Sequence, residues 1–93
     1  ILRAIRDSGG FAIAVSDEAI LAARDEMAAE TGFLLCPEGA ATYAAWRQSV
    51  RDGRIAANDR AVLFNCATGL KYPMPPAGTP LDRHLPIDYG SLA

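Results

Sequence analysis

The sequence has few cysteines, no excess of positive charge and no long apolar run. Its two cysteines, Cys36 and Cys66, are too few for a disulfide framework or a zinc site, which needs about four grouped ligands. Nine Lys and Arg against eleven Asp and Glu give a net charge of -2, which excludes the basic surface typical of nucleic-acid binding. No run approaches the roughly 20 apolar residues of a membrane-spanning helix, and no signal peptide opens the chain. We therefore expect a cytoplasmic protein with reduced thiols and neither nucleic-acid nor membrane partners.

What is present is the composition of a folded chain. Hydrophobic residues make up 51% of the 93 residues and charged residues 22%, a balance that excludes disordered and low-complexity classes. This length suffices for one small domain or for a piece of a larger one. Ile1 stands where an initiator Met would, inside a helical pattern that ends at Gly9 and Gly10. We therefore expect the chain to start in the middle of a fold.

Three short apolar runs, at residues 11–15, 33–36 and 61–64, alternate with two segments of helical pattern. Such unbroken runs are typical of strands that are covered on both faces. The first helix should run over 17–31, because Ser16 can cap its start and Gly32 can end it. The second should run from Pro37 to about residue 52.

The order strand, helix, strand, helix, strand predicts an α/β fold, with a partial parallel sheet joined by right-handed crossovers and flanked by helices. We expect this unit to span residues 1–71 and an extended, proline-rich tail to span residues 72–93. Ligands of open parallel sheets bind beyond the carboxyl ends of the strands. The turns that follow residues 15, 36 and 65 should therefore line one crevice, with Gly69 allowing the backbone to bend or to approach a ligand closely.

One stretch after the third run, Asn-Cys-Ala-Thr-Gly-Leu-Lys-Tyr-Pro at residues 65–73, resembles the closing motif of threonine synthases. Residues 14–20 and 36–41 resemble the same family in the same order, so the resemblance covers about residues 1–73. It implies the C-terminal part of the large domain of a fold-type II enzyme (tryptophan synthase beta-like fold) with the cofactor pyridoxal 5'-phosphate. It also implies a homo-oligomer that converts O-phospho-L-homoserine and water to L-threonine and phosphate, as a carbon-oxygen lyase of threonine biosynthesis.

The resemblance also implies a cofactor-binding set. The family's hydroxyl that hydrogen-bonds the pyridine nitrogen falls on Cys66, and Thr68 could take over this role because a thiol is the weaker partner. Asn65 completes the set. A neutral partner of the ring nitrogen favours elimination or replacement over transamination. Two structural alternatives to this cofactor-binding role stay open. The turn could only satisfy the hydrogen bonds of its own backbone, and the Cys66 thiol could be buried under a strand end. We expect Cys36 to be a core residue.

We expect this chain alone to be inactive and to bind the cofactor weakly. Its only lysine, Lys71, matches the closing motif's own lysine, and the family's Schiff-base lysine lies far upstream. No glycine-rich phosphate cradle is present. We expect Glu38 to be a helix-capping carboxylate and His84 to be a surface residue. We therefore assign no catalytic residue and no metal ligand.

Two other interpretations stay open. The parent could be another fold-type II enzyme, such as a cysteate synthase or a threonine dehydratase. From a different class, the chain could be a non-catalytic α/β interaction module that docks through its sheet edges and proline-rich tail. In isolation, its unpaired edges should cause self-association or partial unfolding.

Overall fold

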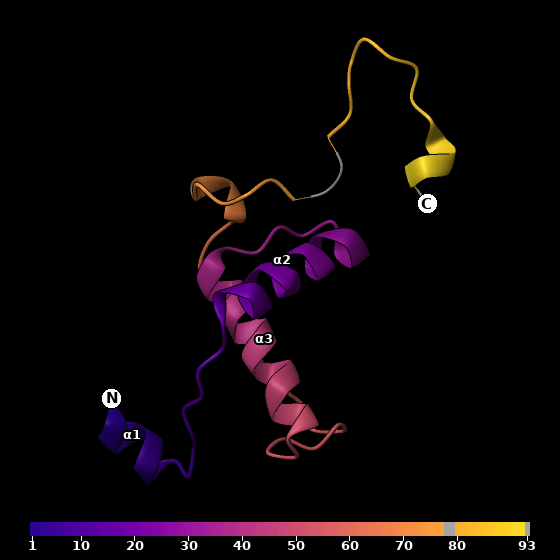
Figure 1. Ribbon diagram of the computed structural model, residues 1–93. Coiled ribbons are helices and arrows are strands. Elements are labelled where there is room, and N and C mark those ends of the chain that lie inside the picture. Colours follow the sequence, from indigo (N-terminus) through magenta and orange to yellow (C-terminus); the bar gives the residue numbers. More distant parts are fainter. Residues whose placement is uncertain (78–79, 93) are drawn as a thin grey trace.

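The structure, a computed structural model, describes residues 1–77 and 80–92. Its elements are α1 (Leu2–Asp7), α2 (Asp17–Thr31), α3 (Pro37–Arg51) and two short 3-10 helices, η1 (Gly69–Lys71) and η2 (Tyr89–Leu92). Figure 1 shows α2 and α3 crossing at the centre, while α1 and the C-terminal segment extend away from them at opposite ends. None of the helices in the described residues combines the length and the hydrophobicity that a membrane-spanning segment needs.

The helix predicted over 17–31 is confirmed as α2. The Ser16 hydroxyl accepts a hydrogen bond from the Ala19 amide at 3.2 Å, which satisfies one of the free donors of the first turn. The helix ends where Gly32 adopts a φ of 73°, a left-handed conformation that glycine takes without a steric penalty. Local sequence signals therefore define both ends of α2.

The second predicted helix is confirmed as α3, which begins at Pro37. Its N-cap is Cys36, whose Sγ accepts a hydrogen bond from the Gly39 amide at 3.3 Å. Glu38 lies in the first turn, where a carboxylate is favoured by the helix dipole. A buried sulfur therefore takes the capping role that a hydroxyl or carboxylate oxygen plays in most helices.

A small core forms where α2 and α3 cross. Its buried apolar residues are mostly small: Ala23, Leu35, Cys36, Ala40 and Ala44. Small side chains allow the two helices to approach closely.

Polar and aromatic contacts flank this crossing. The Tyr43 hydroxyl donates to a Glu26 carboxylate oxygen at 3.3 Å, and Arg47 forms an ion pair with the same carboxylate. On α3 itself, the rings of Tyr43 and Trp46 stack with centroids 5.9 Å apart.

The predicted parallel sheet is wrong. Within residues 1–77 and 80–92 there is no strand, and the one isolated bridge, between Leu35 and Thr68, is antiparallel. The runs 11–15, 33–36 and 61–64 do not pair with one another, so their backbone groups lack the ladder of hydrogen bonds that defines a sheet. Val62 is 95% exposed and Phe64 79%, the opposite of the two-sided burial that their apolar pattern predicted.

The molecule is elongated. Its radius of gyration is 16.6 Å, whereas a compact domain of this length has about 12 Å. The principal extents of 58 × 28 × 20 Å reflect the segments that extend from the central helix pair. Packing is therefore concentrated where α2, α3 and the segments adjoining them meet.

Arg24 of α2 attaches the beginning of the tail to this centre. The residue is 3% exposed, and its Nη1 donates to the Pro75 carbonyl at 2.8 Å. Its Nε donates to an Asp25 carboxylate oxygen, also at 2.8 Å, which pairs the charge. A buried, paired guanidinium therefore connects α2 with a segment 51 positions further along the chain.

Candidate functional site

Two of the three turns that were expected to line one crevice meet at the start of α3. The Gly69 amide donates to the Leu34 carbonyl at 3.0 Å, next to the bridge between Leu35 and Thr68. One residue further along, the Cys36 thiol donates to the Asn65 side-chain oxygen at 3.3 Å. The segments before α3 and η1 are therefore joined by both backbone and side-chain hydrogen bonds.

A glycine lies on each side of this contact, where a Cβ atom would meet a neighbouring group. A Cβ atom on Gly69 would lie 2.6 Å from the Leu35 carbonyl oxygen, closer than atoms can approach. A Cβ atom on Gly39 would lie 2.0 Å from the Asn65 side-chain oxygen. At Gly69 the group in close approach is the backbone of this chain, and the predicted approach of Gly69 to a ligand stays a prediction.

The third turn, at Ser16, has a different role. Its hydroxyl caps α2, and its carbonyl accepts the first helical hydrogen bond from Ile20. Among the described residues, the structure records no hydrogen bond from Ser16 to Cys36 or Asn65. The crevice expected from three strand ends is thus reduced to a junction of two turns.

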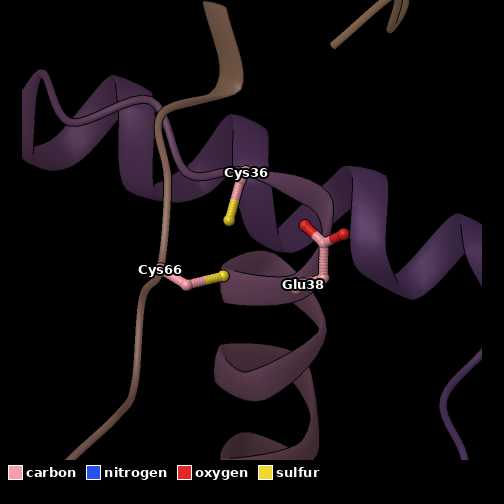
Figure 2. Close-up of side chains that lie close together, drawn as sticks. All are labelled: Cys36, Glu38 and Cys66. Atoms are coloured by element: carbon pink, nitrogen blue, oxygen red, sulfur yellow. The ribbon is translucent and has the colours of Figure 1, made fainter. Parts of the chain in front are cut away.

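Three reactive side chains converge at this junction. The Cys36 and Cys66 sulfurs and a Glu38 carboxylate oxygen all lie within 4.8 Å of one another. Figure 2 shows the side chains pointing toward a common centre from the N-cap of α3, its first turn and the 65–68 loop. Cys36 is completely buried, whereas Cys66 and Glu38 are exposed. The junction therefore has a buried base and a solvent-accessible opening.

The neighbourhood disfavours negative charge on Cys66. A hydrogen bond with Cys36 is the largest factor that raises the pKa of the Cys66 thiol, and desolvation and the charge of Glu38 add to it. The same carboxylate is the main reason that the pKa of Tyr72 is raised. Cys66 is therefore a protonated thiol at neutral pH.

The other two members of the predicted cofactor-binding set lie beside Cys66. Asn65 uses both ends of its amide, since Oδ1 accepts from Cys36 and Nδ2 donates to the Ala67 carbonyl at 3.0 Å. Thr68 is half-buried, and its hydroxyl oxygen accepts from the Leu70 amide at 3.4 Å. Asn65 is thus committed to holding the turn, as the turn-structure alternative predicted, while the Thr68 hydroxyl proton has no recorded acceptor among the described residues.

The remaining residues singled out in the sequence lie outside this junction or play other roles. Lys71 is exposed in η1, and the exposed His84 accepts a hydrogen bond from Arg83 at 3.2 Å. The prediction of a core cysteine is confirmed for Cys36, but the alternative of a buried thiol fails for Cys66, which is exposed.

Two features of this region are not predicted from the sequence. The first is the role of Glu38 beyond capping, although its spacing from Cys36 places both residues at the N-terminus of α3. The burial of Arg24 had no signal in the helical pattern, because its partner is a backbone carbonyl of the tail.

Comparison with known proteins gives consistent results. The model of the pyridoxal-phosphate dependent enzyme family matches residues 1–67. The threonine synthase of Methanocaldococcus jannaschii is 36% identical to this chain over 72 residues, and that of Methanosarcina acetivorans is 40% identical over 72 residues. Each match covers 77% of this chain and 18% of the relative, so the chain spans less than a fifth of the length of these relatives. No solved structure matches the chain significantly.

Proposed function

Since this chain belongs to the pyridoxal-phosphate dependent enzymes, we propose that it is part of a threonine synthase-like enzyme. The enzyme converts O-phospho-L-homoserine and water to L-threonine and phosphate. The observation that carries this proposal is the identity of 36% and 40% to two threonine synthases over 77% of the chain. The proposal includes a C-terminal large-domain piece at residues 1–71, a tail at residues 72–93, and a cytoplasmic homo-oligomer.

The junction supports this proposal because two segments of the family resemblance, 36–41 and 65–73, come together in space. They are separated by the whole of α3, yet Cys36 and Asn65 are in hydrogen-bond contact. A ligand site shared by two motif segments requires that the segments lie in contact. This contact does not depend on the parallel sheet, whose prediction was wrong.

The donors at the junction fit the nitrogen end of a pyridine ring. Cys66 offers an exposed, protonated thiol, and Thr68 offers a hydroxyl whose proton can be donated. Pyridoxal phosphate, when bound, supplies an electron-withdrawing ring that stabilises negative charge developing on the substrate's carbon atoms. We propose that Cys66 or Thr68 binds the ring nitrogen, with Asn65 holding the turn in place.

These groups also bear on the type of reaction. A neutral donor opposite the ring nitrogen limits how much charge the ring withdraws, which favours elimination and replacement over transamination. The raised pKa of Cys66 keeps its thiol neutral at physiological pH. The electrostatics are therefore suited to loss of a phosphate group and addition of water.

The test compares three substrates with the enzyme that carries this chain. We expect phosphate and threonine to form from O-phospho-L-homoserine, with little product from phosphoserine or threonine. A preference for phosphoserine would favour a cysteate synthase, and a preference for threonine would favour a threonine dehydratase. We expect the 93-residue chain alone to be inactive, because the family's Schiff-base lysine lies upstream. Turnover by the chain alone would contradict that part of the proposal.

Two substitutions separate the candidate ring partners. If Thr68 binds the ring nitrogen, Thr68→Val should lower kcat and shift the cofactor's absorption, while Thr68→Ser should preserve both. If Cys66 does so, Cys66→Ala should have this effect and Cys66→Ser should be tolerated. Normal absorption and kcat in both Thr68→Val and Cys66→Ala would refute the assignment to this turn.

A further inference from the structure

The convergence of Cys36, Glu38 and Cys66 has a second consequence that family membership does not supply. We propose that these three side chains bind a thiophilic divalent cation of the Zn²⁺ type. The two cysteines alone are too few ligands for a zinc site. The structure adds a carboxylate, which brings the number of protein ligands to three.

The distances suit such a cation. Zinc binds thiolate sulfur at about 2.3 Å and carboxylate oxygen at about 2.0–2.2 Å, so tetrahedral geometry places neighbouring donor atoms about 3.5–3.8 Å apart. The three donor atoms already lie within 4.8 Å of one another without a metal. Closing the site requires movements on the order of 1 Å, and the two exposed side chains, Glu38 and Cys66, can make them.

Contacts with neighbouring groups hold the Cys36 sulfur in place, so it can act as the immobile ligand of the site. Its sulfur accepts from the Gly39 amide and contacts the Asn65 side-chain oxygen, both at 3.3 Å. After the thiol loses its proton, the Gly39 amide can still donate to the thiolate. This amide contact orients the metal ligand and strengthens binding, whereas the hydrogen bond to the Asn65 oxygen ends when the thiol proton is lost.

The donor types select the class of cation. Two thiolates and one carboxylate suit Zn²⁺ and similar soft or borderline ions, whereas Mg²⁺ and Ca²⁺ require mostly oxygen ligands. Binding forms two metal–sulfur bonds and one metal–oxygen bond, and the two thiol protons pass to solvent. Because Cys66 and Glu38 are exposed, water can occupy the fourth position.

One consequence depends on the proposed function. If Cys66 binds the ring nitrogen of the cofactor, the same sulfur cannot hold a cation at the same time. The cation and the cofactor would then compete for the junction. The proposed cation site does not depend on this competition, because all three of its protein ligands belong to this chain and none is supplied by the cofactor.

The test uses Co²⁺ as a spectroscopic probe for Zn²⁺ in the full, reduced 93-residue chain, without cofactor or substrate. We expect one equivalent of Co²⁺ to give sulfur-to-cobalt charge-transfer absorption, which Zn²⁺ then removes by displacement. Glu38→Gln should weaken Co²⁺ binding by at least about 10-fold, and Cys66→Ser should reduce the charge-transfer absorption by about half. The matched control is Glu18→Gln, since Glu18 is also an exposed carboxylate in the first turn of a helix, and it should bind Co²⁺ like the parent chain.

A second measurement needs no substitution. Zn²⁺ should slow the alkylation of the exposed Cys66 by iodoacetamide at least 10-fold, while Mg²⁺ should leave the rate unchanged. Absence of charge-transfer absorption, equal weakening by Glu18→Gln and Glu38→Gln, or unaltered alkylation with Zn²⁺ would each overturn the site. These readouts do not involve turnover, so their failure is distinguishable from a failure of the proposed enzymatic function.

Discussion

Replacement of Gly69 by alanine should separate the two turns that form the junction. The new Cβ would lie 2.6 Å from the Leu35 carbonyl oxygen and 2.8 Å from the Leu34 side chain, whereas ordinary contacts begin at 3.4 Å. The backbone would have to move by about 0.8 Å, the difference between 3.4 and 2.6 Å. Overpacking of this kind costs about 1–3 kcal/mol. Loss of the hydrogen bond from Gly69 to Leu34 adds about 0.5–1.5 kcal/mol.

The assay for Gly69→Ala combines urea unfolding, followed by circular dichroism, with mass-spectrometric detection of cysteine alkylation. We expect the free energy of unfolding to fall by about 1.5–4.5 kcal/mol, the sum of these two costs. Cys36, which is fully buried at the junction, should become reactive. The control is Gly90→Ala, because a Cβ there meets only the exposed Asp88 carboxylate at 3.3 Å, which can rotate away. If the two variants unfold alike and Cys36 stays protected in both, the role assigned to Gly69 is wrong.

Three further predictions concern the helices and the thiols. Arg24→Met should release the tail segment that contains Pro75. The lost hydrogen bond to a charged group should lower the free energy of unfolding by about 1.5–3 kcal/mol. Trypsin should then cleave faster after Lys71, and an unchanged cleavage rate would contradict this. Cys36→Ala should remove the hydrogen bond that most raises the pKa of Cys66. The pH midpoint of Cys66 alkylation, measured in metal-free buffer, should therefore shift downward, and an upward shift or none would refute the cause given. Backbone and Ser16 hydrogen bonds lower the pKa of Glu18 below its ordinary 4.5, so the stability that its charged form gives α2 should be present above pH 4.5 and be lost as the pH falls through the lowered pKa. Circular dichroism should show a smaller acid-induced loss of helix in Glu18→Gln, and equal losses would count against this explanation.

The helices could be predicted because their signals are local. Ser16 and Gly32 mark the ends of α2 through contacts that reach no further than four residues, and Pro37 marks the start of α3 in the same way. The sheet prediction failed because apolar runs do not specify a partner. Residues 61–64 have the composition of a buried strand, yet no neighbouring strand accepts their hydrogen bonds within the part of the chain that the structure describes.

The site was predictable only in part, for the same reason. The turn at residues 65–68 was identified from its residues and from a resemblance, and the structure places it against the N-terminus of α3. The proximity of Glu38 to both thiols depends on how that turn meets α3, which no local pattern encodes. The buried Arg24 is a similar case, since its interaction with Pro75 becomes apparent only when the tail is in place.

The stacked rings of Tyr43 and Trp46 on α3 provide an intrinsic fluorescence signal. Trp46 is the single tryptophan, and its ring lies 5.9 Å from that of Tyr43, whose hydroxyl bonds to Glu26 of α2. Light absorbed by the tyrosine can therefore pass to the indole, and the emission reports whether α3 keeps the two rings stacked. Trp46 also borders a shallow hollow lined by Phe11, Val62 and Leu63. A blue shift of its fluorescence would therefore reveal when another surface covers that hollow, without any added dye.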